Sequence, residues 1–318
     1  MPCISIGLPV YNGEAFLAQT LDSLLSQTVA DFELIISDNT SKDRTPEICA
    51  SYAKKDSRIK YSRTDKLLRP GENYNRTLEL SSGKYFKWAA HDDICAPTFL
   101  EKCLEVLEAD PSVVLAYSKV KVIDSEGCEI EDYTYKLATD SPSVSERFGA
   151  LVRANHRIHG AYEIFSLIRN ETLKSIPRKG NYARADSVVL ARLSLRGRFY
   201  QVPELLFFSR DHGGRSVHAV PTRVQRGRTR LHCYIGTGPL PPTEWWDPAK
   251  KGKIDFPEWR IAKQYISSIR DAPLTSSERL QCASQIARWL AGSWPKLGRD
   301  LIIAGEQMLM GAPQANRA

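Results

Sequence analysis

The 318-residue sequence lacks the marks of several protein classes. No stretch approaches the roughly 18 consecutive apolar residues of a membrane-spanning helix, so none is expected. The first residues have the pattern of a strand rather than the basic segment and apolar run of a signal peptide, which favours a cytoplasmic location. The seven cysteines are odd in number and include no Cys-x-x-Cys pair, so reduced thiols are favoured over a zinc site or a disulfide framework.

Two common phosphate-binding motifs are also missing. Residues 9–14, which follow the first predicted strand, contain one glycine and no Gly-x-Gly-x-x-Gly. Gly-x-x-x-x-Gly-Lys-Ser/Thr occurs nowhere in the chain. Dehydrogenases and P-loop enzymes depend on these motifs to cradle phosphates, so the sequence argues against both classes. A composition of 42% hydrophobic and 25% charged residues is nevertheless that of an ordinary folded protein.

Positive charge is unevenly distributed. Residues 1–218 hold 29 basic and 29 acidic side chains, whereas residues 219–318 hold 15 and 8, so the whole net charge of +7 lies in the last hundred residues. A basic tail indicates contact with something anionic, such as a phospholipid surface or an acidic acceptor. A solvated basic face without a partner is the alternative. Nothing indicates a nucleic-acid partner.

Hydrophobic periodicity predicts an α/β fold. Short apolar runs alternate with amphipathic segments in the first hundred residues, which is typical of a parallel sheet with right-handed helical crossovers. The predicted strands are 3–10, 32–37, 58–62 and 84–89, and the predicted helices are 14–27, 43–56 and 73–80.

The remainder is expected to change character after a boundary near residues 213–222. Before it we expect helices at 98–108, 145–154 and 186–196, strands at 113–122 and 161–168, two β-rich runs at 198–202 and 205–210, and a loop-rich segment at 124–145. Beyond it we expect helices near 257–270, 276–291 and 296–310 and no strands.

Acidic residues follow two of the predicted strands. Asp38 comes after the second strand, and Asp92 and Asp93 come after the fourth. The carboxyl ends of parallel strands meet at one edge, where ligands bind in such sheets. A lone aspartate there can equally be a helix N-cap, which is the alternative for Asp38. The adjacent pair repels itself unless a cation compensates, and oxygen ligands of this kind suit Mg²⁺ or Mn²⁺.

Six segments, in this order and spacing, resemble family-2 glycosyltransferases with the GT-A fold. They are distributed over about the first two-thirds of the chain and are Ile4–Gly13, Ser26–Thr28, Glu33–Asn39, Gly83–Asp93, Ala185–Leu193 and Arg210-Asp211-His212 with Ser216. The resemblance implies a Rossmann-like, mostly parallel sheet flanked by helices, with a C-terminal helical extension. It also implies a catalytic domain over residues 1–216 (nucleotide-binding half 1–96, acceptor-binding half 97–216) and a basic extension over 217–318.

The resemblance assigns a role to each matching residue. Pro9 and Tyr11 would flank the nucleobase, Asp38 would accept a hydrogen bond from its ring N–H, and Asp92 would hold ribose or metal. Asp93 would ligate the Mg²⁺ or Mn²⁺ that bridges the diphosphate, His212 would add a metal or phosphate contact, and Asp186 would be the catalytic base. The alternatives are an imidazole whose hydrogen bonds are satisfied within a turn for His212, and a carboxylate that compensates the helix dipole in the first turn for Asp186. Lys66 and Arg69 lie where many relatives have a glycine-rich turn, which would bring cations to the nucleotide; surface charge is the alternative for both.

Two departures from the family pattern put catalysis in question. Ala90 stands where an aspartate is usual, and Ala185 replaces the usual glutamate before the base. They favour a catalytically silent nucleotide-sugar or glycan-binding module as the main alternative. A nucleotidyltransferase is a further one, although it should have a glycine-rich, basic loop after the first strand.

The expected activity is an inverting transfer from a nucleotide-diphosphate sugar, with UDP as the default nucleotide, to a hydroxyl of a glycan or lipid-linked acceptor in cell-surface polysaccharide synthesis. In the extension, Arg223, Arg226, Arg228 and Arg230 spread over more than one helix face, which does not support a narrow membrane-binding stripe. Its apolar positions favour packing on the catalytic domain or on a second copy in a homodimer. Peripheral contact with the inner face of a membrane is the alternative.

Overall fold

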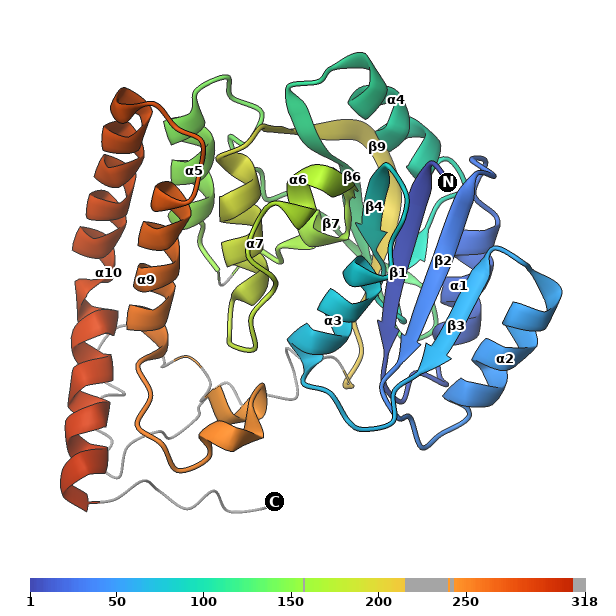
Figure 1. The fold of residues 1–318 in the computed structure, drawn as a ribbon, viewed down its shortest axis with the longest axis horizontal. Coiled ribbons are helices and arrows are strands. Elements are labelled where there is room, and N and C mark those ends of the chain that lie inside the picture. The colour runs from blue at the N-terminus through green and yellow to red at the C-terminus, as the bar shows by residue number, and fades with distance from the viewer. Residues whose placement is uncertain (157, 215–239, 241–242, 311–318) are drawn as a thin grey trace.

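The computed structural model describes residues 1–156, 158–214, 240 and 243–310 (Figure 1). The arginines at 223–230 and the predicted boundary beyond residue 214 lie outside these residues. The expected α/β architecture is confirmed, with one central sheet and helices on both of its faces.

The first half of the sheet is parallel. Its strands β3, β2, β1 and β4 are neighbours in that order, so their carboxyl ends lie along one edge. The elements are β1 (Ile4–Val10), α1 (Leu17–Leu25), β2 (Phe32–Asp38), α2 (Thr45–Lys55), β3 (Ile59–Arg63), α3 (Pro70–Glu79) and β4 (Tyr85–Trp88). All seven residues of β1 and of β2 are buried, because helices cover both faces of these strands.

The second half of the sheet contains both parallel and antiparallel strand pairs. The sheet continues from β4 through β8, β6 and β9 to β5; β8 runs antiparallel to both of its neighbours, and β6 and β9 are parallel. The elements are β5 (Ile94–Cys95), α4 (Phe99–Ala109), β6 (Val113–Ile123), β7 (Glu129–Tyr133), α5 (Val144–Val152), η1 (Tyr162–Phe165), β8 (Leu167–Arg169), α6 (Asn170–Lys174), α7 (Ala185–Ser194) and β9 (Arg198–Arg210).

Each face of the sheet has its own hydrophobic core. Strand β4 shows why, since its side chains alternate: Tyr85 faces one core, and Phe86 and Trp88 contribute to the other. The first core lies under α1, α2 and α4, and the second under α3, α5 and α7. These two layers hold the loops at the strand ends in place.

The C-terminal helices extend the second core. They are α9 (Pro257–Arg270) and α10 (Ser276–Met310), preceded by the short turns η3 (Thr243–Trp245) and η4 (Pro248–Lys250). Ile261, Tyr265 and Trp289 join Phe148 of α5 and Val188 of α7 in one buried cluster. Figure 1 shows α5 and α7 between these helices and the strands. The C-terminal helices thus pack on α5 and α7 of the same chain, although Ile266 and Leu280 stay exposed.

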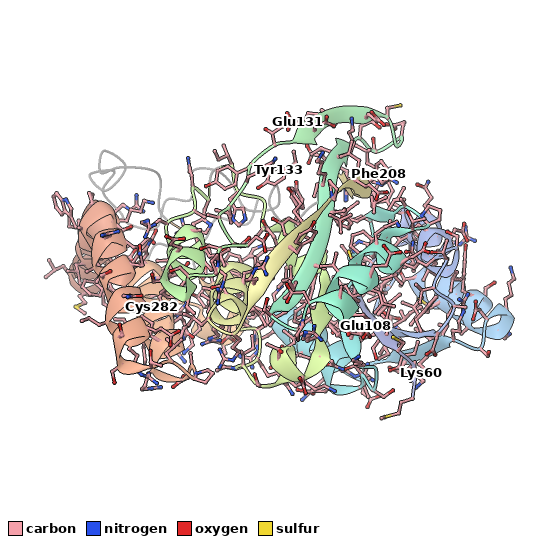
Figure 2. All side chains as sticks on the ribbon, turned by 90° about the horizontal axis from the view of Figure 1, so that it is seen from above. Lys60, Glu108, Glu131, Tyr133, Phe208 and Cys282 are labelled. Carbon is pink, nitrogen blue, oxygen red and sulfur yellow. The ribbon has the colours of Figure 1, made fainter. Side chains whose placement is uncertain are left out.

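Several expected elements differ in detail. The segment 161–168 is a 3₁₀ turn followed by the three-residue β8, and the loop-rich 124–145 contains β7, whose Glu131 and Tyr133 stand at the upper rim in Figure 2. The runs 198–202 and 205–210 form one strand, because Pro203 and Glu204 bulge between the pairs Ser118–Val202 and Lys119–Leu205.

The helices expected at 276–291 and 296–310 are likewise one helix. Pro295 lies inside it. A proline removes the hydrogen bond to the carbonyl four residues earlier, here that of Ala291, and Ala291 is exposed, so water can satisfy this carbonyl. No helix in the described parts of the chain is both long and apolar enough to cross a membrane.

Candidate active site

The loops that follow β1 and β2 are bound to each other. The backbone N–H of Asn39 donates to the carbonyl of Val10 (2.8 Å), and that of Asn12 donates to Ser41 Oγ (2.9 Å). Asn12 and Thr40 both have positive φ angles, 50° and 58°. This conformation is costly for a β-branched residue such as Thr40, and it persists where surrounding contacts impose it, often at functional sites.

Asp38 lies fully buried at the end of β2. Its Oδ1 accepts a hydrogen bond from the Ser41 backbone (2.9 Å), and its Oδ2 accepts one from the Tyr61 hydroxyl (3.1 Å) and lies 3.5 Å from Arg63 Nε. Burial raises the pKa of Tyr61, and the neighbouring Asp38 charge raises it further. Asp38 therefore stabilises this edge, and a nucleobase would have to share its oxygens with the protein.

The other residues expected around the nucleotide have different exposures. Pro9 is buried in β1 opposite Ser37, whereas Tyr11, just beyond the strand, is 44% exposed. Lys66 is exposed in the loop after β3. Arg69 is held elsewhere, since its guanidinium pairs with Glu72 and, at 3.0 Å, with Asp247.

Asp92 and His212 meet at the end of β4. The imidazole Nε2 of His212 lies 2.9 Å from Asp92 Oδ2, and its ring packs against Phe16 with centroids 4.6 Å apart. The fully buried Arg210 connects this pair to the sheet, because its Nε donates to the Asp92 carbonyl and its Nη2 to Gln19 Oε1. The end of β9 and the loop after β4 thus form one rigid unit.

Asp93 is buried beside them. Its Oδ1 accepts a hydrogen bond from the Arg210 backbone N–H (3.0 Å), and its carbonyl accepts one from Thr20. The preceding His91 packs on Gly13, where an added Cβ would lie 2.7 Å from the His91 ring, so the loop after β1 needs glycine at this point. Burial lowers the pKa of His91, against the opposing charge of Asp92.

A divalent cation fits Asp92 and His212 only if other ligands complete its shell. Among the described residues, no group of three or more His, Cys, Asp or Glu side chains is arranged to hold a metal ion. A carboxylate and an imidazole can still hold Mg²⁺ or Mn²⁺ when phosphate oxygens of a substrate supply the rest. The donor set is consistent with that arrangement.

Asp186 lies in the first turn of α7, with its side chain 37% exposed. Its carboxylate pairs with Lys179, which is only 12% exposed. Just before it, Arg184 has a positive φ of 64° as the N-cap of α7. An ion pair across this loop and a left-handed residue at its end fix the direction of the Asp186 side chain.

Tyr74 of α3 joins the two groups of acids. Burial raises the pKa of its hydroxyl, and the charges of Asp186, Asp92 and Asp93 raise it further. Lys179 Nζ lies 3.9 Å from the centre of the Tyr74 ring. Trp88, the last residue of β4, donates from its indole Nε1 to the Tyr74 carbonyl at 3.1 Å, so Tyr74 lies between the strand that precedes Asp92 and the ion pair at the start of α7.

Three contributors to this site escaped the sequence reasoning. Lys179 stands in a polar loop without any motif, and Tyr74 follows a helical pattern that predicts only packing. Arg210 was visible in the Arg210-Asp211-His212 segment, but only the fold reveals that it bonds to both Asp92 and Asp93.

A sequence profile of Glycosyl transferase family 2 matches residues 5–176, more than half of the chain. The chain belongs to glycosyltransferase family 2. The match ends before Asp186 and His212, so their roles remain predictions. The GT-A-type fold, by contrast, is confirmed by the topology and by a solved member of the same fold.

That structure is S. aureus TarS residues 1–349 in complex with UDP, with a TM-score of 0.58, 16% identity and coverage of 91% of this chain and 72% of TarS 1–349. A glycosyltransferase from Methanocaldococcus jannaschii is 31% identical over 134 residues, which are 42% of this chain and 46% of that protein. Chondroitin synthase from Escherichia coli is 30% identical over 128 residues, 40% of this chain and 18% of the synthase. The chain therefore spans about half or less of the length of these curated relatives.

Proposed function

We propose that this family-2 chain is an inverting glycosyltransferase that moves a sugar from a nucleoside diphosphate to an acceptor hydroxyl. The observation that carries the proposal is the position of Tyr74 between two groups: Lys179, the ion-pair partner of Asp186, has its Nζ 3.9 Å from the centre of the Tyr74 ring, and Trp88 at the end of β4 donates from its indole Nε1 to the Tyr74 carbonyl at 3.1 Å. A single displacement needs a donor-binding group and a base on opposite sides of the reacting carbon, and no protein nucleophile. The end of β4 would supply the donor side and the start of α7 the base.

The nucleotide is assigned to the loops after β1 and β2. Tyr11 would offer an exposed ring for the base, Pro9 and Asp38 would form the floor, and Lys66 would contribute an exposed cation from the loop after β3. Uridine is the nucleoside we favour, supported by the UDP complex of the similarly folded TarS.

The diphosphate is assigned to the acidic edge. A divalent ion bound there would stabilise the negative charge that grows on the departing diphosphate. Asp93 and His212, with Asp92 between them, would hold Mg²⁺ or Mn²⁺. Arg210 keeps both aspartates in position through its two hydrogen bonds.

Asp186 is assigned as the general base that takes the proton from the acceptor hydroxyl. Its ion pair with Lys179 orients the carboxylate before an acceptor arrives. An incoming hydroxyl has to reach the same carboxylate, so we expect the lysine to shift as the acceptor binds. Lys179 would then continue to balance the charge of the site.

The acceptor is proposed to be a glycan or a lipid-linked sugar, in cell-surface polysaccharide synthesis at the inner face of the membrane. Exposed apolar side chains on the outer helices support peripheral contact or a homodimer; they are Ile266, Leu280, Trp294 and Leu301. Isolated exposed side chains are also common on monomers, so liposome co-sedimentation and sedimentation velocity should decide between these states.

A catalytically silent sugar-nucleotide-binding module is the second candidate. Lys179 already forms an ion pair with the Asp186 carboxylate, and Ala90 and Ala185 depart from the family pattern. The two functions differ in turnover. UDP-, dTDP- and GDP-sugars are first screened by thermal shift with Mn²⁺ or Mg²⁺, since a ligand at 100 times its Kd adds about 2.7 kcal/mol of stability.

The best donor is then incubated with candidate acceptors. Acceptor-dependent release of the nucleoside diphosphate, with an inverted anomeric centre by NMR, supports the transferase. Stabilisation by a donor without any acceptor-dependent release supports the silent module, and a retained anomeric configuration contradicts single displacement.

A further inference from the structure

A cavity of about 590 Å³ lies between the first half of the chain and the C-terminal region. Three walls form it: Arg69 at the start of α3, Asn181 and Tyr182 in the loop before α7, and the stretch from Thr243 to Gln264. Neither the acidic edge nor the loops after β1 and β2 contribute to its lining. It is thus separate from the residues assigned to the donor.

The lining carries excess positive charge. Four basic side chains face two acidic ones, Asp247 and Asp255. Both acids are already paired, Asp247 with Arg69 at 3.0 Å and Asp255 with Arg260. Lys250 and Lys263 are exposed and take part in no ion pair with a described residue. Two uncompensated cations at the mouth of a cavity attract an anion.

Aromatic side chains line the same space. Tyr182, Phe256 and Trp259 contribute to the wall, and Trp259 is 43% exposed. The indole Nε1 of Trp259 donates to the Leu297 carbonyl at 3.1 Å, which fixes the orientation of the ring. A rigid, accessible aromatic face suits the C–H faces of a sugar ring, and ligand sites commonly combine such faces with a few polar groups.

The cavity adjoins the proposed base. Tyr182 is four residues before Asp186, and its carbonyl accepts a hydrogen bond from the Ala185 backbone at 3.2 Å. Asn181 Oδ1 in turn accepts one from the Gly71 backbone at 2.9 Å, which anchors the loop to α3. One short loop therefore forms a wall of the cavity and carries Asp186.

We propose that this cavity binds an anionic sugar unit of the acceptor, one that carries a phosphate or a carboxylate. The ring would lie against Trp259 and Tyr182, and its oxyanion would meet Lys250 and Lys263. The acceptor hydroxyl on the neighbouring unit would then reach Asp186. This substrate class rests on the transferase function proposed above, but the binding itself can be measured without a donor.

The test uses three small probes with the full-length protein and no nucleotide: methyl glucoside, glucuronic acid and glucose 6-phosphate. Binding is measured by calorimetry or saturation-transfer NMR. We expect at least one anionic sugar to bind about tenfold more tightly than the neutral one, and binding to weaken as salt rises. Preference for glucose 6-phosphate identifies a phosphate-bearing acceptor, and preference for glucuronic acid a carboxylate-bearing one.

A charge-matched pair of variants locates the binding. The double variant Lys250→Glu with Lys263→Glu should lower the affinity for the anionic sugar by at least about tenfold. The double variant Lys251→Glu with Lys253→Glu makes the same change in net charge on exposed residues that do not line the cavity. It should lower the affinity for the anionic sugar by less than about twofold at physiological salt. Equal losses in both pairs, or equal affinity for neutral and anionic sugars, would overturn the proposal.

Donor binding and turnover are measured on the same preparations. If the protein transfers sugar but shows no preference for anionic probes, only the cavity proposal is contradicted. If the protein binds the anionic probes in the cavity but never transfers sugar, only the transferase proposal is contradicted.

Discussion

Replacing Glu258 with alanine should destabilise the protein strongly. Glu258 is 1% exposed at the start of α9 and lies between two guanidiniums, with Arg184 Nη1 at 3.6 Å and Arg299 Nη2 at 3.8 Å. Arg299 is fully buried, and the Glu258 backbone N–H donates to the buried Asp300 at 2.7 Å. Among the described residues, Arg184 and Arg299 thus meet the carboxylates of Glu258 and Asp300 at this point.

The expected loss follows from these contacts. Without Glu258 the buried cluster has an uncompensated positive charge, and breaking a buried ion pair from one side costs about 3–5 kcal/mol. Unfolding entropy of about 2.1 cal/mol/K per residue amounts to about 0.7 kcal/mol/K for a chain of this length, so Tm should fall by about 4–7 °C. Differential scanning calorimetry measures the change, provided that the chain unfolds in one transition.

Glu278→Ala is the matched control. Glu278 is half-buried at the start of α10 and accepts a hydrogen bond from the Thr275 backbone at 2.8 Å, so its loss removes one helix-capping contact and leaves no buried charge behind. The two variants should therefore differ by at least a factor of two in stability lost. Equal losses would contradict the interpretation of the Glu258 cluster as a buried network of ion pairs.

Glu258→Ala should also affect turnover, because Glu258 pairs with Arg184, the residue with positive φ two positions before Asp186. We expect kcat to fall with little change in donor affinity, when both are measured at a temperature where the variant is fully folded. Glu258→Gln, which keeps the shape but not the charge, should give an intermediate result. Unchanged kcat in Glu258→Ala would mean that the cluster stabilises the fold without positioning the base.

Three further predictions concern single groups. Asp186→Asn should lower kcat by about 10²–10⁴-fold with nearly unchanged nucleotide affinity; a variant that keeps more than about a third of the rate would rule out the base. EDTA should weaken binding of the nucleoside diphosphate in isothermal titration, and equal affinity with undiminished Asp93→Ala turnover would exclude a metal role. Burial alone would raise the pKa of Glu33, but hydrogen bonds from Lys60, Ser5 and Ser82 outweigh it and lower the pKa from 4.5 to about 2. Since this pKa is depressed by folding, Glu33 stabilises the protein above about pH 4.5 and this stability is lost as pH falls towards 2, so Glu33→Gln should flatten the acid limb of a Tm-against-pH curve in that interval.

The sequence predicts well what depends on local pattern. The buried runs that became β1 and β2 are continuous and apolar, and turn residues bound them, so their positions follow from periodicity. The order of parallel strands then places Asp38 and Asp92 at one edge. For these two aspartates, the structure agrees with the position expected from the sequence and supplies the distances to their neighbours.

Contacts between distant segments could not be predicted in this way. Glu258 approaches Arg184 across more than seventy residues, and nothing in the pattern of α9 distinguishes its buried carboxylate from an exposed one. The pairing of β7 with β6 stabilises a segment, Glu129–Tyr133, whose polar sequence alone favours a loop. In both cases tertiary partners outweigh local propensity.

The core shared by α5, α7 and the two last helices limits how this chain can be recombined with its relatives. Phe148 and Val188 pack in the same cluster as Ile261, Tyr265 and Trp289, and Figure 2 shows Cys282 of α10 at the opposite end of the molecule from Lys60 of β3. A chimera that exchanges only the C-terminal helices would mismatch this interface and lose several kcal/mol of packing. The helices α5, α7, α9 and α10 should therefore be exchanged together with β4, whose Phe86 and Trp88 belong to the same core, and the strands from β1 to β3 can be left untouched.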